Sequence, residues 1–224
     1  MLRSRVLAGS MLAMLVLPAA VLADDGAGHG VSVGVLGGLN GLGVELGYRF
    51  NERFGLHGET GNYSYDQSAD NSDFDIDGKI KLNSIGVLGD FYPFGGSFRI
   101  SAGLRSNHNK FEGVATPASG TVKVGDDTYT AAQVGTLTGD AKFKKASPTV
   151  TLGWAGKYKT GLEFGFDLGV VAQGSPKLNV TSNGTYANNA TFQQDLDQKV
   201  AEWQDDVKDY KLWPVIQLHL LYRF

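Results

Sequence analysis

The chain has 224 residues, no cysteine, 31 glycines and a formal net charge of −3. The lack of cysteine excludes a disulfide framework, so stability has to come from backbone hydrogen bonds and packing. The small net charge and the lack of a basic stripe give no reason to expect nucleic acid as a partner. Glycine at this frequency, without a collagen period, suits tight turns and strongly curved strands.

The N-terminal segment is typical of a secretory signal peptide. It begins with MLRSR, continues with an apolar run over 6–21 and ends at Ala23 before an acidic pair. We expect cleavage after Ala23, with a signal peptide over 1–23 and one mature domain over 24–224. An uncleaved anchor is disfavoured, because the apolar run is interrupted by Pro18 and is shorter than the roughly 20 residues of a spanning helix.

The rest of the chain alternates between apolar and polar residues in short segments, which is the period of a β-strand. Eight strands are expected, over 31–40, 43–50, 54–65, 80–92, 98–107, 147–158, 162–170 and 213–224. The connections after the second, fourth and sixth strands are brief, whereas the loops over 66–78, 112–142 and 173–211 are long. This pattern predicts an all-β fold: an eight-stranded antiparallel up-and-down transmembrane barrel with short periplasmic turns, long extracellular loops and both termini in the periplasm.

The last strand has an apolar face that runs to the final residue, formed by Ile216, Leu218, Leu220, Tyr222 and Phe224. This terminal aromatic, with apolar residues at alternate positions before it, resembles the final strand of the small outer-membrane barrels of Gram-negative bacteria, the OmpA, OmpX and OmpW type. The resemblance covers essentially all of the mature chain. The stretches LGDFYPFGGSFRISAGL from Leu88 and YTAAQVGTLTGD from Tyr129 are also similar to outer-membrane proteins of this length.

The resemblance implies a place in the cell outer membrane after export through the periplasm. It implies contact with outer-membrane lipid and lipopolysaccharide, and it makes the five residues of the last strand an assembly signal for the barrel-assembly machinery. A closer kinship with the CarO-type porins stays open, because the chain holds no motif specific to them.

The polar faces of the strands would point into the lumen of such a barrel. They carry five acids, five bases and two histidines: Glu45, Arg49, His57, Glu59, Asp90, Arg99, Arg105, Lys157, Glu163, Asp167, His219 and Arg223. An eight-stranded barrel is only wide enough for its side chains to fill it, and a lone buried charge costs several kcal/mol. We therefore expect a salt-bridged plug. A narrow path for a small polar or zwitterionic solute is the alternative, and the two histidines are assigned no function.

The second outer loop holds a partial calcium motif. Asp73, Asp75, Asp77 and Gly78 match the opening of an EF-hand loop, but Ser84 stands where the bidentate glutamate belongs. An acidic, solvated loop is the favoured interpretation. We expect no metal site, and no cofactor is expected either.

The third long loop changes period and predicts an amphipathic helix over 189–210. Its apolar stripe consists of Phe192, Leu196, Val200, Trp203, Val207 and Tyr210. The polar side is mostly acidic, whereas helices that lie on membranes prefer basic faces. We expect the stripe to dock on the barrel mouth or on neighbouring loops.

One serine and histidine pair could in principle act as a nucleophile and its base. Ser106 and His108 lie two residues apart on the outward face of one strand, a spacing similar to that of outer-membrane lipid A deacylases, but in reversed order. The sequence places no acid to orient the imidazole, so polar residues at the end of a strand are the favoured interpretation. We expect a protein that is not an enzyme, with a structural, envelope or surface-interaction role. A narrow porin and a lipid A-modifying enzyme are the alternatives.

Overall fold

A computed structural model describes residues 30–70, 74–118, 120–155 and 160–224, so the expected signal peptide over 1–23 lies outside the described residues. Eight antiparallel strands form a ring in the order β4-β3-β2-β1-β13-β11-β10-β5, which the pairing of β5 with β4 closes. They are β1 (Gly30–Gly38), β2 (Gly41–Arg49), β3 (Phe54–Asp70), β4 (Phe74–Phe91), β5 (Phe98–Asn107), β10 (Ala146–Trp154), β11 (Gly161–Ala172) and β13 (Leu212–Arg223). The expected eight-stranded antiparallel barrel is confirmed.

The two faces of the barrel wall have opposite chemistry, because successive side chains of a strand point to opposite faces. On β10, Ser147 and Thr149 point inward and are buried, whereas Val150 and Leu152 point outward and are exposed by 49% and 48%. The same alternation holds around the ring, so apolar side chains cover the outside and polar ones fill the inside. No helix in the described part of the chain is long and apolar enough to cross a bilayer.

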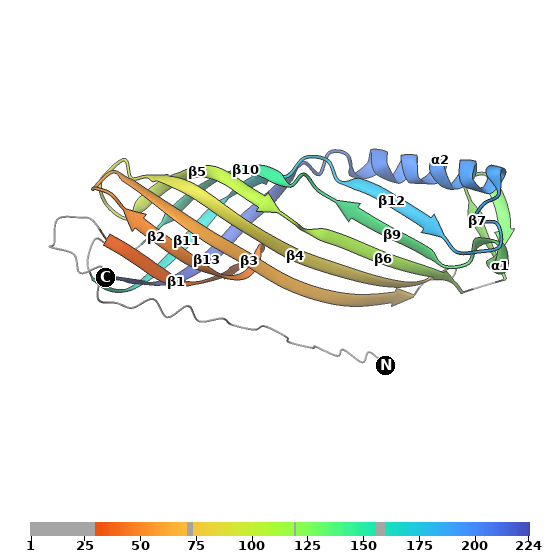
Figure 1. Ribbon diagram of the computed structural model, residues 1–224, viewed down its shortest axis with the longest axis horizontal. Helices are drawn as coiled ribbons and strands as arrows, with labels where there is room; N and C mark the ends of the chain where they lie inside the picture. The colour runs from red at the N-terminus through yellow and green to blue at the C-terminus, as the bar shows by residue number, and fades with distance from the viewer. Residues whose placement is uncertain (1–29, 71–73, 119, 156–159) are drawn as a thin grey trace.

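The sheet continues beyond the ring on one side of the barrel (Figure 1). The C-terminal half of β4 pairs with β5 and closes the ring. Its N-terminal half extends beyond the ring and pairs with β6 (Lys110–Pro117). Two further strands, β9 (Leu137–Lys142) and β12 (Lys177–Ser182), then follow in that order. We call the outer parts of β3 and β4 together with β6, β9 and β12 the extension.

The prediction of a loop over 66–78 is wrong. Its described residues continue β3 and β4, which pair in register as far as Asp70 and Asp75. The hydroxyl of Ser68 donates to Asp77 across this pair at 2.5 Å. The long hairpin is ordered by β6, which supplies β4 with a second ladder of hydrogen bonds beyond the barrel.

A small apolar core closes the far end of the extension. A hairpin of β7 (Thr121–Val124) and β8 (Asp127–Thr130) is followed by α1 (Ala131–Val134), and α2 (Ala190–Val207) lies along β12 (Figure 1). Their shared cluster contains Val122, Val124, Tyr129, Val134, Leu137, Phe192 and Leu196. The expected helix is present and docks on neighbouring loop elements. Only the first part of its stripe is buried, since Trp203 and Tyr210 are exposed by 38% and 68%.

One hydrogen bond joins α2 to the β7–β8 hairpin, and its contribution to stability depends on pH. The hydroxyl of Tyr129 donates to Asp195 at 2.5 Å, and this bond raises the pKa of Tyr129 to about 12. The pKa of a tyrosine in the unfolded chain is about 10. Because the folded protein raises this pKa, the full stabilisation by the hydrogen bond is present below about pH 10. That contribution is lost as the pH rises through about 12. We expect the absorbance titration of the native protein minus that of Tyr129→Phe to show one tyrosine that ionises near pH 12. Tyr210→Phe controls for the loss of one tyrosine, and a difference curve centred near pH 10 would contradict the expectation.

Candidate functional site: the barrel lumen

The charged residues that the apolar–polar alternation predicted for the inner faces of the strands lie inside the barrel. Each described one is buried, with at most 6% of its surface exposed: Glu45, Arg49, His57, Glu59, Asp90, Arg99, Arg105, Glu163, Asp167, His219 and Arg223. Lys157 lies outside the described residues. Six of the eight strands of the ring contribute to this set.

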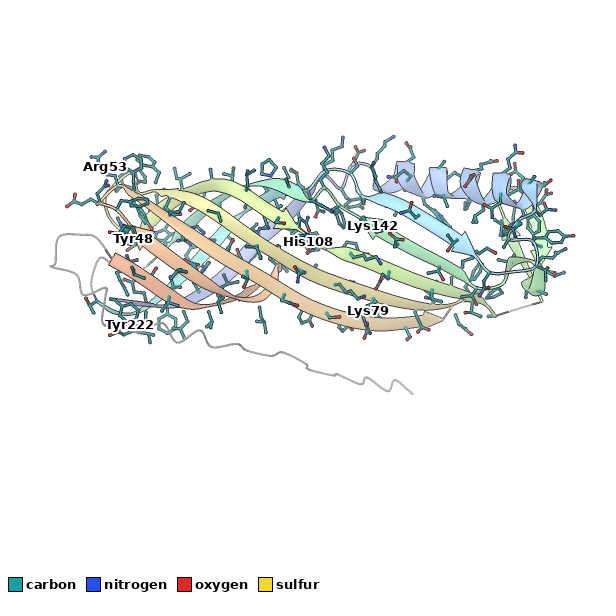
Figure 2. The ribbon with its side chains drawn as sticks, in the orientation of Figure 1. Tyr48, Arg53, Lys79, His108, Lys142 and Tyr222 are labelled. Carbon is teal, nitrogen blue, oxygen red and sulfur yellow. The ribbon has the colours of Figure 1, made fainter. Side chains whose placement is uncertain are left out.

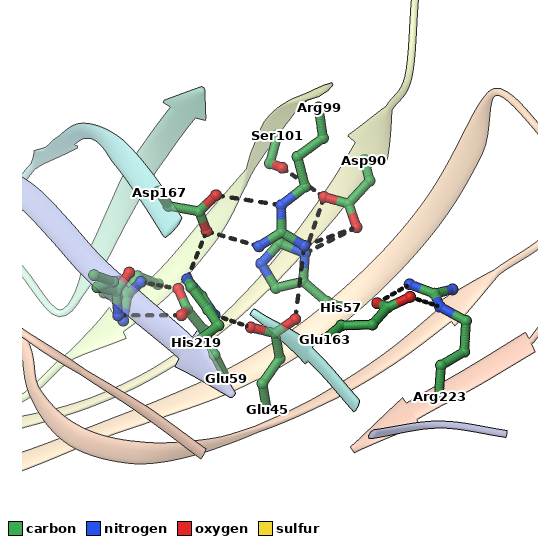
Figure 3. Close-up of polar contacts among 12 residues, drawn as sticks. Glu45, His57, Glu59, Asp90, Arg99, Ser101, Glu163, Asp167, His219 and Arg223 are labelled. Carbon is green, nitrogen blue, oxygen red and sulfur yellow. Dashed lines mark hydrogen bonds and ion pairs between the residues drawn. The ribbon is translucent and has the colours of Figure 1, made fainter. Parts of the chain in front are cut away.

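A cluster around Arg99 spans the lumen (Figure 3). Arg99 on β5 makes two hydrogen bonds to Asp167 on β11, at 2.7 and 3.2 Å. Its third nitrogen lies 3.6 Å from Glu45 on β2 and 3.8 Å from Asp90 on β4. Neither β2 nor β11 is a neighbour of β5 in the ring, so the guanidinium joins separate parts of the wall across the interior.

Both lumen histidines belong to this cluster. His219 Nδ1 lies 2.6 Å from Glu45, and its Nε2 lies 3.1 Å from Asp167. His57 Nδ1 lies 2.9 Å from Asp90, which also accepts a hydrogen bond from Ser101 at 2.5 Å. Each imidazole is thus fixed by carboxylates that also face Arg99. The arrangement is a network of ion pairs and hydrogen bonds that joins four acidic or basic side chains to two imidazoles and one hydroxyl.

Two smaller groups lie on either side of this cluster. Towards the extension, Arg105 pairs with Glu59 and donates to the hydroxyl of Ser84 at 3.1 Å, while Gln217 donates to Glu59 at 3.2 Å. Towards the C-terminal rim, Arg223 makes two hydrogen bonds to Glu163, both at 3.2 Å. Acids and bases therefore face one another at three levels along the barrel.

Arg49 has a different role from the other lumen bases. Its guanidinium donates to the backbone carbonyl of Glu52 at 2.7 Å and to those of Gly95 and Gly96 at 3.3 and 3.1 Å. It also stacks over the ring of Tyr92, 3.5 Å from the centroid. Arg49 therefore ties two turns together at the C-terminal rim.

One small cavity lies among these side chains. A cavity of about 10 Å³ lies between the Arg99 cluster and the rim, lined by residues that include Ser32, Arg49 and Tyr92. That volume is at the lower limit for a single water molecule. Neutral residues complete the filling on the same inner faces, and the alternation could have found them: Ser84, Ser101, Asn107, Ser147, Thr149, Thr151 and Gln217.

An aromatic group lies where the lumen meets the extension. Phe111 on β6 packs against Phe143 with ring centroids 5.4 Å apart, and against Trp213 at 6.3 Å. Trp213 is the first side chain of β13 on the face that points into the barrel. These rings therefore lie at the end of the lumen nearest the extension. The sequence pattern did not predict this group, because Phe111 and Phe143 border the expected loop over 112–142 and lie outside every expected strand.

In the part of the chain that the structure describes, neither of the two other candidate sites has a complete set of residues. Asp73 lies outside the described residues, and Asp75 and Asp77 stand on a regular strand. The described residues hold no group of three or more potential ligands that could bind a metal ion. The Ser106 hydroxyl lies 3.5 Å from His108 Nδ1, and no carboxylate hydrogen-bonds to that imidazole among the described residues. The pair lacks the acid that would orient it for nucleophilic catalysis.

The chain has the fold of a small antiparallel β-barrel, and solved outer-membrane proteins are similar to it in fold. The crystal structure of CarO2 from Acinetobacter baumannii matches with a TM-score of 0.60 and 18% identity, over 87% of this chain and 98% of that one. The crystal structure of CarO from the same organism matches with a TM-score of 0.54 and 16% identity, over the same shares of the two chains, 87% and 98%. No known family and no curated protein matches the sequence. At these identities the likeness shows the fold.

Proposed function

We propose that this chain is an integral protein of the bacterial outer membrane, without enzymatic activity. In this proposal the barrel crosses the bilayer, its lumen is closed to solutes, and the extension outside carries the structural or surface-interaction role. The neighbours of this fold are outer-membrane proteins, which supports the location.

The outer surface of the barrel supports a lipid environment. Large apolar side chains with at least two-fifths of their surface exposed occur on every strand of the ring, among them Val35, Leu46, Leu56, Val87, Leu104, Leu152, Phe164 and Leu218. A continuous apolar surface of this kind is unfavourable in water and favourable in a bilayer. At the rim with short turns, aromatic pairs such as Trp154 and Phe166, with stacked rings 4.9 Å apart, are typical of an interfacial girdle.

The last strand supports recognition by the barrel-assembly machinery. Ile216, Leu218, Leu220 and Tyr222 all point outward and are exposed by 51%, 70%, 37% and 43%. Phe224 packs against Tyr222 with ring centroids 5.0 Å apart. The face is therefore accessible from outside the barrel wall.

The observation that carries the closed lumen is the position of Arg99, which is joined to Asp167, Glu45 and Asp90 across the interior. A solute would have to displace a guanidinium that three buried carboxylates hold. Breaking such a buried pair by removing one partner costs about 3–5 kcal/mol.

Conductance in a planar bilayer tests the proposal. We expect no steady openings from the refolded chain, whose folded state is checked by its altered gel mobility before heating. Arg105→Ala serves as the second sample, because Arg105 is the base of the lumen group nearest the extension. Steady openings whose size changes in Arg105→Ala would contradict the closed lumen and would support a narrow porin for small polar or zwitterionic solutes.

A further inference from the structure

We propose that a row of lysines on the outer face of the extension binds the phosphorylated headgroup of lipopolysaccharide. The inference rests on the proposed outer-membrane function and names a partner for the extension. Its basis is the strand register together with a groove beside the row.

The register places four lysines directly opposite one another on four neighbouring strands. Lys81 on β4 faces Lys110 on β6, Lys110 faces Lys142 on β9, and Lys142 faces Lys177 on β12. We call these four residues the lysine row. Like charges placed opposite one another destabilise a sheet, so four in succession indicate an anion beyond the protein's own carboxylates.

The acids near the lysine row offset only part of its charge. Glu112 lies 2.6 Å from Lys81 and 2.5 Å from Lys110, and Asp140 lies 3.0 Å from Lys142. Hydrogen bonds from Lys110 and then from Lys81 hold the pKa of Glu112 at about 2, so this carboxylate is ionised at neutral pH. Two carboxylates thus face four ammonium groups.

More lysines continue the positive charge towards the barrel. Lys144 and Lys145 follow Lys142 along the chain and are exposed. Apart from Glu112 and Asp140, acids of the extension such as Asp66 and Asp77 lie farther from the barrel along β3 and β4. Positive charge is therefore gathered at the part of the extension nearest the barrel.

The lysine row begins where the apolar band of the barrel ends. Lys81 lies ten residues along β4 from Phe91, which belongs to the aromatic rim. At roughly 3.4 Å per residue and a strand tilt of about 40°, Lys81 stands about 26 Å from that rim along the barrel axis. The apolar band of an outer-membrane barrel is about 25 Å tall. The ammonium of Lys81 therefore reaches the level of lipid headgroups.

A groove of about 470 Å³ adjoins the lysine row on the side away from the barrel. Its walls include Ser68, Lys79, Glu112, Thr138 and Asp140. Carboxylates accept hydrogen bonds from sugar hydroxyls, and protein hydroxyls both donate to them and accept from them. Figure 2 shows Lys79 and Lys142 on this part of the extension. From the barrel outward, the surface thus offers an apolar band, then lysines, then a polar groove. That order matches the acyl chains, phosphates and sugars of lipopolysaccharide.

The test compares lipid binding by charge-matched variants of the full refolded chain in detergent micelles. The double variant Lys142→Gln with Lys177→Gln removes two charges from the lysine row, and one ion pair with them. The double variant Lys123→Gln with Lys199→Gln also removes two charges and one ion pair, but from the β7–β8 hairpin and α2. The probes are diphosphorylated lipid A and the same lipid with its phosphates removed, and binding is measured by native mass spectrometry.

We expect the native chain to prefer the phosphorylated lipid. The row variant should weaken that binding by about tenfold or more, since each lysine near an anionic surface contributes roughly fivefold. The control variant should bind as the native chain does. Equal loss in both variants, or no preference for the phosphorylated lipid, would overturn the inference. Displacement of lipid A by micromolar inorganic phosphate at constant ionic strength would also overturn it, because the row would then be a site for the free ion.

The outcome separates this inference from the proposed function. Insertion of the chain into liposomes does not depend on the lysine row. A chain that inserts but shows no lipid A preference loses only the lysine-row proposal, whereas a folded chain that does not insert loses the outer-membrane function itself.

Discussion

Replacing Arg99 with methionine is expected to lower the free energy of unfolding of the barrel by about 3–5 kcal/mol. The change keeps a long, flexible side chain but removes the cation that faces Asp167, Glu45 and Asp90 in the lumen. Those three carboxylates are each exposed by no more than 5%, so water cannot replace the guanidinium. The loss is large because it leaves buried charge uncompensated, whereas removing an exposed charge costs little.

Urea unfolding in liposomes, followed by tryptophan fluorescence, measures this effect. Arg53→Met is the matched control, since Arg53 stands exposed in the turn before β3 (Figure 2). We expect the control to change the free energy of unfolding by less than about 1 kcal/mol. If Arg99→Met were as stable as the control, the Arg99 cluster would not hold the barrel wall together.

Replacing Gly103 with alanine is the second change with a large expected effect, about 1–3 kcal/mol or more. A Cβ at Gly103 would overlap the carbonyl oxygen of Val87 and lie 2.6 Å from the Cα of Leu88. Both neighbours are backbone atoms of β4, so the β4–β5 pair would have to move apart. That pair closes the ring, and a shift there disturbs every hydrogen bond of the seam.

Gly113→Ala is the control for Gly103→Ala. Gly113 also stands inside a strand, β6, but a Cβ there would meet nothing within 4 Å. Alanine in an open strand position is expected to be neutral or slightly stabilising, because it restricts the unfolded chain. Urea unfolding in liposomes again measures the free energy of unfolding of both variants. Similar values for the two would show that β4 and β5 can move apart at little cost.

The barrel and the inner faces of its strands were predictable from the sequence. Alternation alone assigns Glu45, Arg99 and Asp167 to one face of their strands, because the period of two is a local property of the chain. Their meeting was not predictable. Arg99 and Asp167 stand on strands that are not neighbours, and their contact depends on the stagger of the whole ring, which no local pattern encodes.

The strands of the extension were missed for a different reason. The segment over 66–78 is rich in Asp and also holds Ser, Asn and Gly, which is the composition of a loop. Its described residues are extended because β6 pairs with β4 beyond the barrel, a contact between segments far apart in the sequence. The short strands β9 and β12, of six residues each, likewise depend on their partners for order.

The branching of β4 has a consequence for how this protein can change over evolutionary time. The segment from Lys110 to Lys142 leaves after β5 and returns before β10, and these two strands are neighbours in the ring. The segment from Lys177 to Val207 leaves after β11 and returns before β13, which are neighbours as well. Each insertion therefore begins and ends at one seam between adjacent strands. Such modules can change in length without altering the stagger of the ring, so the topology lets the surface of the extension diversify while the barrel scaffold keeps its strand order.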